Sequence, residues 1–241
     1  MTHASDKTAI VVGASRGLGR GIAAALADDG RPVIAVARSL PASTHDRIEP
    51  VVADAADATA PGSLLDRYEP DVLVLVAGAA PLMRPLQHQT WETFSVNWNT
   101  DVRIAFHWLR EALLRPLRPG SRVVVISSGA AVAGSPLSGG YAGAKATQRF
   151  LTGYAQDEAQ RAGLGITFTA VLPRLTPLTD LGRPAVRAYA ARSGQSEAEY
   201  VDQLGEPVTP EIAGVAVVEL LHADAVAPAY LLTGGGLQPL P

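Results

Sequence analysis

A tyrosine and a lysine four residues apart form the most specific chemical pattern in this sequence. Tyr141 and Lys145 lie in the segment GGYAGAKATQ, and Lys145 is one of only two lysines in a chain whose other basic residues are arginines. Helical residues four apart share one face. An ammonium beside a phenol favours the phenolate, so the pair predicts a general acid–base group that works near neutral pH.

A serine hydroxyl is expected at the same site. Ser128 ends the apolar run RVVVISS and stands thirteen residues before Tyr141. Ligands bind at the carboxyl ends of strands in open α/β sheets, where a substrate-binding hydroxyl belongs. Adjacent strand residues point to opposite faces, so only one of Ser127 and Ser128 can meet a substrate. The spacing to Tyr141 favours Ser128.

A glycine-rich turn near the N-terminus predicts a dinucleotide site. Gly13, Gly17 and Gly19 lie in VGASRGLGRGIA, between an apolar run and an alanine-rich segment. Glycine permits the tight turn, and backbone amides at a helix N-terminus bind a pyrophosphate. The spacing is one residue longer than the usual dinucleotide fingerprint. A purely structural glycine turn is the alternative.

Two arginines beside this turn favour NADP(H) over NAD(H). NAD sites place an acid near the end of the second strand, where it binds the ribose 2′-hydroxyl. Here that strand ends in Ala37-Arg38-Ser39, and Arg16 lies inside the glycine loop. Guanidinium binds phosphate through a bidentate fork, so both arginines predict a 2′-phosphate. The alternative is that they are solvated surface arginines.

Apolar runs alternate with helical segments along the chain. Most runs are apolar at consecutive positions, as in strands buried on both faces of a parallel sheet. The pattern predicts one α/β domain, a Rossmann-like doubly wound parallel sheet of about seven strands flanked by helices. A proline-containing excursion at about 174–205, with a polar helical middle, predicts a substrate lid. Strands are expected at 8–12, 32–37, 51–53, 71–77, 122–128, 166–172 and 229–233, and helices at 17–30, 91–115, 141–162 and 209–224.

The composition excludes several classes of site and partner. The chain has 241 residues, a net charge of −3 and no basic stripe, which argues against nucleic acid as a partner. It has no cysteine, and its five histidines are scattered without ligand spacing, so no metal site is expected. No apolar run is long enough to span a bilayer, and no apolar signal segment is visible. A soluble, cytoplasmic protein is expected.

The joint order of these motifs resembles the classical short-chain dehydrogenase/reductase family over essentially the whole chain. The resemblance implies that Tyr141 exchanges a proton with the substrate oxygen, while Lys145 binds the nicotinamide ribose. It gives Ser128 the substrate carbonyl and Asn97 a water in a proton relay. The matching segments are VGASRGLG (12–19), Asp54, AG (77–78), VN (96–97), ISS (126–128) and YAGAK (141–145).

The resemblance also implies an activity and an assembly. The expected function is transfer of a hydride between NADPH and a carbonyl or alcohol substrate. An NADP-binding regulatory protein without turnover and an epimerase or dehydratase of related fold are the alternatives. Many relatives form dimers or tetramers through the segments corresponding to 91–115 and 141–162. The cofactor is expected to contact Gly13, Ser15, Arg16, Gly17, Leu18, Gly19, Arg38, Asp54, Ala55, Ala77, Gly78, Tyr141, Lys145, Pro173 and Thr176.

Four departures from the family pattern stand near the expected site. Val12 replaces a threonine, and Leu75-Val76 replace two asparagines, which suggests a drier sheet edge. The link from Arg38 to Ile48 carries Pro41, and its usual helix is expected to be truncated. Arg174 replaces a glycine and either reaches an anionic group or points to solvent.

Thr179 is an alternative to Thr176 at the cofactor. The segments 79–86 and 129–138 favour an apolar or weakly polar substrate, whereas Arg84, Arg174 and Arg183 would instead signal an acid group.

Overall fold

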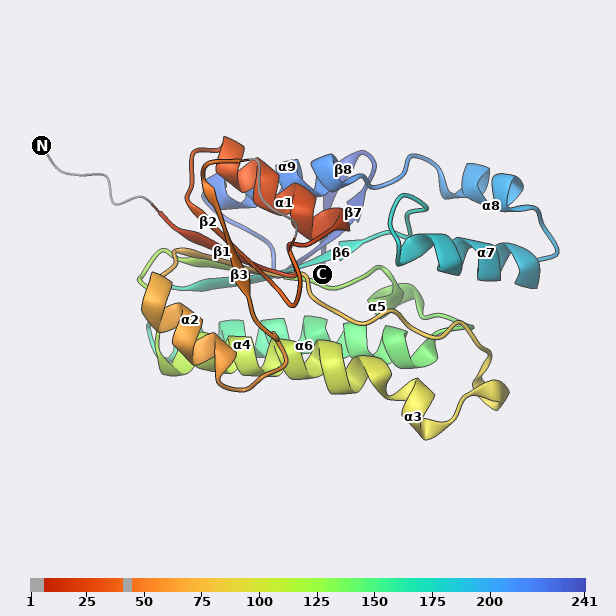
Figure 1. Ribbon diagram of the computed structural model, residues 1–241, viewed down its shortest axis with the longest axis horizontal. Coiled ribbons are helices and arrows are strands. Elements are labelled where there is room, and N and C mark those ends of the chain that lie inside the picture. Colours follow the sequence, from red (N-terminus) through yellow and green to blue (C-terminus); the bar gives the residue numbers. More distant parts are fainter. Residues whose placement is uncertain (1–6, 41–44) are drawn as a thin grey trace, which may run out of the picture.

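An eight-stranded, mostly parallel sheet forms the centre of the computed structural model, which describes residues 7–40 and 45–241 (Figure 1). The strand order is β3-β2-β1-β4-β5-β6-β7-β8, and β8 pairs antiparallel with β7. This confirms the expected doubly wound α/β fold. The strands are β1 (Ala9–Val12), β2 (Val33–Ala37), β3 (Ile48–Val52), β4 (Val72–Leu75), β5 (Arg122–Ile126), β6 (Thr167–Pro173), β7 (Ala229–Thr233) and β8 (Gly236–Leu240).

Helices cover both faces of the sheet. On one face lie α1 (Gly17–Asp28) and α9 (Pro210–His222); on the other lie α2 (Ala60–Tyr68), α4 (Arg103–Leu114) and α6 (Gly139–Arg161) (Figure 1). Ile10 packs into the core beneath α4, whereas its neighbour Val11 packs into the core beneath α1. Successive strand residues thus enter different cores, which explains why the runs are apolar at consecutive positions.

The segment expected as one helix at 91–115 is broken into three parts. α3 (Trp91–Phe94) begins at a capping box formed by Thr90 and Thr93, and it ends after one turn. A π-helical turn, η2 (Trp98–Val102), then leads into α4. π-Helical turns are rare and cluster at functional sites. This one inserts between α3 and α4 where the chain passes the expected site.

The predicted lid folds into two helices beyond the edge of the sheet layers. α7 (Gly182–Arg192) and α8 (Glu197–Leu204) lie to the right of the sheet in Figure 1. The expectation of one polar helical segment is wrong, because Gly194 takes a positive φ of 69° between them. The rings of Tyr189 and Tyr200 stack with centroids 6.2 Å apart and join the two helices.

The sequence patterns did not predict some elements and predicted others at the wrong position. The eighth strand, β8, and the short helix α2 had no expectation, and β3 begins three residues before the expected run at 51–53. Around the expected truncated helix after Arg38, the described residues form no helix, and Pro41 lies outside them. Two further short elements are η1 (Leu86–His88) and α5 (Ala130–Ala133).

Candidate active site

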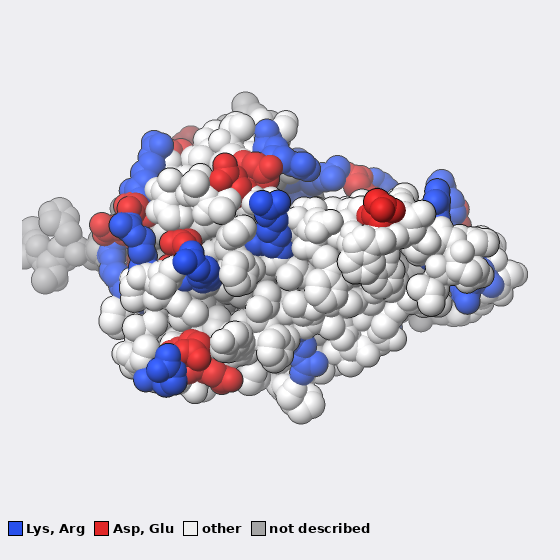
Figure 2. Space-filling model, turned by 90° about the horizontal axis from the view of Figure 1, so that it is seen from below, with Lys and Arg blue, Asp and Glu red and all other residues white. Residues whose placement is uncertain are grey.

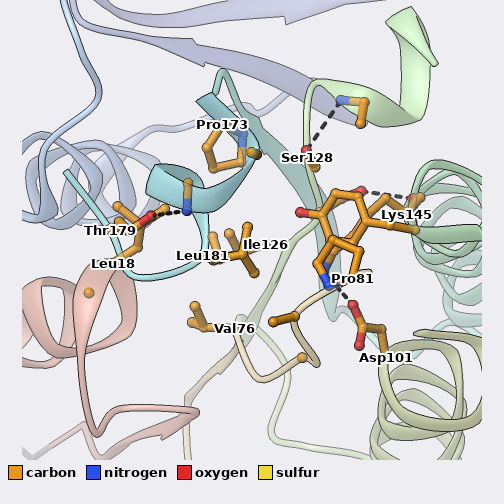
Figure 3. Close-up of a pocket in the computed structure, with 18 of the residues that line it drawn as sticks. Leu18, Val76, Pro81, Asp101, Ile126, Ser128, Lys145, Pro173, Thr179 and Leu181 are labelled. Carbon is orange, nitrogen blue, oxygen red and sulfur yellow. Dashed lines mark hydrogen bonds and ion pairs between the residues drawn. The ribbon is translucent and has the colours of Figure 1, made fainter. Parts of the chain in front are cut away.

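A cleft of about 1470 Å³ opens at the carboxyl ends of the parallel strands. Val76, Ile126 and Pro173, from the ends of β4, β5 and β6, line it together with the glycine loop and the lid (Figure 3). Ligands bind at this edge in open α/β sheets. All fifteen residues expected to contact the cofactor line this one cleft.

The glycine loop forms a backbone cradle at the start of α1. Gly13 has a φ of 98°, and a Cβ there would lie 2.5 Å from the Ala77 nitrogen. A Cβ at Gly19 would lie 2.1 Å from the Gly13 oxygen. No side chain caps α1 by a hydrogen bond and its first turn holds no acid, so its N–H groups remain available to an anion. These residues fit the pyrophosphate of a dinucleotide.

Arg16, Arg38 and Asp54, which follow the ends of β1, β2 and β3, all line the cleft. Arg38 is exposed just after β2 and lines the cleft, as does Asp54, whose Oδ1 accepts a hydrogen bond from the Ala56 nitrogen at 3.0 Å. Arg16 reaches across the cleft to the lid, where its Nη1 lies 3.4 Å from Asp180 Oδ2. Both arginines line the cleft, and their contact with a 2′-phosphate stays a prediction.

Tyr141, Lys145 and Ser128 all line the cleft. The Lys145 Nζ lies 5.5 Å from the centroid of the Tyr141 ring, as expected for residues one turn apart on α6. In Figure 3, Ser128 and Lys145 lie on one side of the cleft and Thr179 and Leu181 on the other. The structure therefore brings these three predicted catalytic residues together.

The two adjacent serines have different partners. Ser127 is buried and donates its hydroxyl hydrogen bond to the Lys145 carbonyl oxygen at 2.7 Å. The Ser128 Oγ accepts a hydrogen bond from the Ala130 nitrogen at 3.2 Å, which leaves its own hydrogen free to donate. Ser127 thus fixes α6 against the end of β5, and Ser128 is the serine available to a ligand.

Asn97 lies behind the wall of the cleft and is not among its lining residues. Its side chain is 2% exposed, and Nδ2 donates to the Ala79 carbonyl oxygen at 2.7 Å. The same nitrogen lies 3.4 Å from both carboxylate oxygens of Asp101. The amide therefore supports the segment that follows β4, whereas its expected role as the anchor of a relay water stays a prediction.

Asp101 is a buried acid of the site that the sequence reading missed. Its side chain is fully buried in η2, and Oδ2 lies 3.2 Å from the Lys145 Nζ. The signal that could have found it is its position: Asp101 falls between Trp98 and Ala105 on the apolar stripe of 91–115. A carboxylate on a buried stripe needs a charged or hydrogen-bonding partner.

Lys145 is buried and held by two partners. Its Nζ donates to Gln148 Oε1 at 2.9 Å in addition to its contact with Asp101. Burial is the largest influence and lowers the pKa of Lys145. Attraction to Asp101, and then to Tyr141, more than offsets burial, so the pKa of Lys145 lies above its usual value. The site therefore holds a fixed ammonium next to the phenol.

The segment predicted to be a lid lines part of the cleft. Tyr189 on α7 makes a short hydrogen bond to the Ser135 hydroxyl, which also contacts the Ser138 hydroxyl at 2.7 Å. Arg174 is exposed and lines the cleft, so its two alternatives stay open. Thr176 and Thr179 both line the cleft as well, and Thr179 Oγ1 accepts a hydrogen bond from the Gly182 nitrogen at 3.0 Å.

Within residues 7–40 and 45–241, no three histidine or acidic side chains come together as metal ligands would. No helix in these ranges combines the length and the apolarity needed to cross a membrane. The cytoplasmic location stays a prediction.

Known proteins resemble the chain along most of its length. The profile of the short chain dehydrogenase family matches residues 7–190. A hydroxynaphthalene reductase-like protein of Metarhizium majus is 28% identical over 261 residues, covering 97% of this chain and 96% of that protein. The 3-oxoacyl-(acyl-carrier-protein) reductase FabG of Staphylococcus aureus is 32% identical over 191 residues, covering 69% and 73% of the two chains.

A solved structure supports the same fold. The NADP-bound structure of ElxO matches with a TM-score of 0.79 and 20% identity, covering 95% of this chain and 98% of that one. Identity this low establishes the shared fold and not a shared substrate.

Proposed function

The chain belongs to the short chain dehydrogenase family, an oxidoreductase family, and we propose that it transfers a hydride between NADPH and a carbonyl or alcohol substrate. The observation that carries this proposal is the meeting of Tyr141, Lys145 and Ser128 beside the glycine cradle, in one cleft. A phenol, a buried ammonium and a free hydroxyl together supply what protonation of a carbonyl oxygen requires.

The proposed roles of the side chains combine their positions in the cleft with the roles that the family resemblance implies. When bound, the nicotinamide cofactor supplies the hydride. The glycine cradle and the uncapped start of α1 hold the pyrophosphate, and Lys145 holds the nicotinamide ribose. Ser128 and Tyr141 donate hydrogen bonds to the substrate oxygen, which polarises the carbonyl. Tyr141 then gives its proton to that oxygen in reduction and accepts it in oxidation, while the ammonium of Lys145 stabilises the phenolate that forms.

We infer a preference for NADPH from two arginines that line the cleft. Arg16 and Arg38 line it, and β2 ends without an acid for the 2′-hydroxyl. Asp54, the acid nearby, follows β3 and matches an adenine contact. A charged hydrogen bond contributes about 1.5–3 kcal/mol, so Arg38→Ala should weaken the use of NADPH by about ten- to a hundredfold and leave NADH nearly unchanged.

The test is the kcat/KM for NADPH and for NADH during reduction of a panel of ketones and aldehydes. Arg20→Ala is the matched control, since Arg20 is an exposed arginine of α1 that does not line the cleft. Equal use of both cofactors by the unaltered protein would contradict the NADPH assignment. A protein that binds NADPH but reduces no member of the panel would favour a regulatory role.

We propose an apolar or weakly polar carbonyl compound as the substrate. Several residues that line the cleft are apolar and carry no charge, among them Pro81, Met83, Val132 and Leu181. The printed names of the relatives refer to a hydroxynaphthalene and to a 3-oxoacyl group, both compatible with such a lining. Stacked Tyr189 and Tyr200 add aromatic surface from the lid.

We also propose that the chain forms a homo-oligomer through α4 and α6. Large apolar side chains stand exposed on these helices, including Phe106, Phe150 and Tyr154 at 50%, 70% and 54%. Figure 2, which views the molecule from the side of α4 and α6, shows a broad area with few charged side chains. Large exposed apolar side chains in an area with few charges are typical of an interaction site.

A further inference from the structure

The proposed chemistry gives the buried carboxylate of Asp101 no role, yet several groups of the site hold this carboxylate in place. Three groups meet its two oxygens. The Ala79 nitrogen donates to Oδ1 at 2.8 Å, Asn97 Nδ2 approaches both oxygens at 3.4 Å, and Lys145 Nζ lies 3.2 Å from Oδ2. Figure 3 shows Asp101 on the same side of the cleft as Lys145.

Neighbouring residues leave this carboxylate little freedom to move. A Cβ at Gly78 would lie 2.8 Å from Asp101 Oδ2, so glycine is needed there to make room for the acid. Gln148 bridges the pair, because its Nε2 donates to the Asp101 carbonyl oxygen at 3.0 Å while its Oε1 accepts from Lys145. The same amide therefore contacts both the Lys145 ammonium and the backbone of Asp101.

We propose that Asp101 is a positioning residue, which fixes the Lys145 ammonium in the wall of the cleft and keeps it protonated. The inference rests on the function proposed for Lys145. A buried ammonium without a partner gives up its proton, because burial disfavours the charged form. Neutral Lys145 would no longer stabilise a phenolate at Tyr141 or bind ribose hydroxyls as a charged donor. Asp101 thus acts through Lys145 and not on the substrate.

The charged groups that face Lys145 are few. Asp101 approaches it from η2, and Tyr141 approaches it from α6 itself. The end of β5 contributes the uncharged Ser127, and the segment after β4 contributes backbone around Gly78 and Ala79. Within the described residues, Asp101 is therefore the acid whose removal should change the protonation of Lys145.

The lysine content of the chain permits a direct test. Lys7 and Lys145 are its two lysines, so protein labelled with ¹³C at the lysine Cε should give two titrating signals by NMR, which Lys7→Arg assigns. Without cofactor, Lys145 in the unaltered protein should titrate above the usual range of lysine, because Asp101 stabilises its charged form, whereas Asp101→Asn should clearly lower its titration point. Lys7 should titrate alike in both proteins.

Two further variants separate this effect from damage to the fold. Leu109→Ala removes a buried side chain of α4 that does not touch Lys145, so it should reduce stability and leave the Lys145 titration in place. Gly78→Ala displaces the Asp101 carboxylate without removing its charge and should lower the titration by a smaller amount. It provides the answer if Asp101→Asn fails to fold.

The consequence for the reaction is a change in pH dependence. With Asp101→Asn, NADPH affinity and turnover should both fall as the pH rises through the lowered titration point of Lys145, and both should recover on acidification. An unchanged Lys145 signal in both Asp101→Asn and Gly78→Ala would overturn the inference. Absence of NADPH turnover in the unaltered protein would instead contradict the proposed function, because the NMR titration needs neither cofactor nor substrate.

Discussion

At the scale of single residues, the environment of Lys145 explains why this arginine-rich chain places a lysine there. The ammonium lies within reach of Asp101 and Gln148 and beside the Tyr141 ring, in a space that is almost closed to solvent. A planar guanidinium is larger and directs its donors in a fixed fork. An arginine at 145 would therefore not reproduce a compact charge shared by an acid, an amide and a phenol.

The spacing of residues made part of the site predictable. Tyr141 and Lys145 are one helical turn apart, and Ser128 ends a strand, so sequence separation alone brings them to one edge of the sheet. Asp101 was not predictable in the same way, because its partner lies 44 residues away on another helix. Asn97 lies behind the wall of the cleft. Its position depends on the π-helical turn η2, which no sequence pattern predicted.

Gly13 offers a prediction about the cradle itself. Gly13 and Gly30 both have φ near 90°, but only at Gly13 would a Cβ meet backbone, 2.5 Å from the Ala77 nitrogen. Gly30→Ala should cost about 1 kcal/mol of unfolding free energy for its conformation alone. Gly13→Ala should cost about 2–4 kcal/mol, because the close contact adds to the conformational strain.

Urea unfolding of the two variants measures the difference. Both glycines have a positive φ, so a greater loss of stability in Gly13→Ala measures the steric contact between the loop and the segment that follows β4. Equal losses would mean that the loop can move away from β4, and the cradle would then not be the rigid phosphate site proposed here.

At the scale of elements, strands and long helices were predictable where packing decides them. β1, β2 and β5 read as apolar runs because both of their faces are covered. β8 was not predicted because this edge strand has the sequence Gly-Leu-Gln-Pro-Leu, in which no position is fully buried. Edge strands need less apolar sequence, and proline is tolerated in them.

Capping residues determine where two helices begin that the apolar periodicity did not predict as separate helices. Thr90 and Thr93 start a helix twelve residues before α4, although the apolar spacing runs through both. In the lid, Ser196 and Glu199 form a capping box that begins α8 after the turn at Gly194. The apolar positions indicate which side of a helix is buried, whereas side-chain hydrogen bonds at the N-cap determine where the helix begins.

At the scale of the whole molecule, the layers leave α4 and α6 with an apolar outer surface. Phe150 and Tyr154 are one turn apart on α6, and their ring centroids lie 6.1 Å apart. In the proposed oligomer these rings would be covered by the same helices of a second copy. Phe150→Asp should then weaken self-association by at least about tenfold, since a buried aromatic side chain is a common source of binding energy.

Light scattering at several protein concentrations measures this effect. The control is Val52→Asp, because Val52 is also exposed, at 72%, but ends the edge-side strand β3. It should leave the mass unchanged. A monomeric unaltered protein, or equal behaviour of the two variants, would contradict the proposed interface.

The most direct test of the whole account is the turnover of Tyr141→Phe with NADPH and a carbonyl substrate, followed alongside NADPH binding. The substitution removes one hydroxyl and keeps the ring beside Lys145. We expect NADPH affinity within about threefold of the unaltered protein and turnover reduced by about a thousandfold, since general acid–base groups contribute about 10²–10⁴. Turnover that survives the substitution would show that Tyr141 does not protonate the substrate.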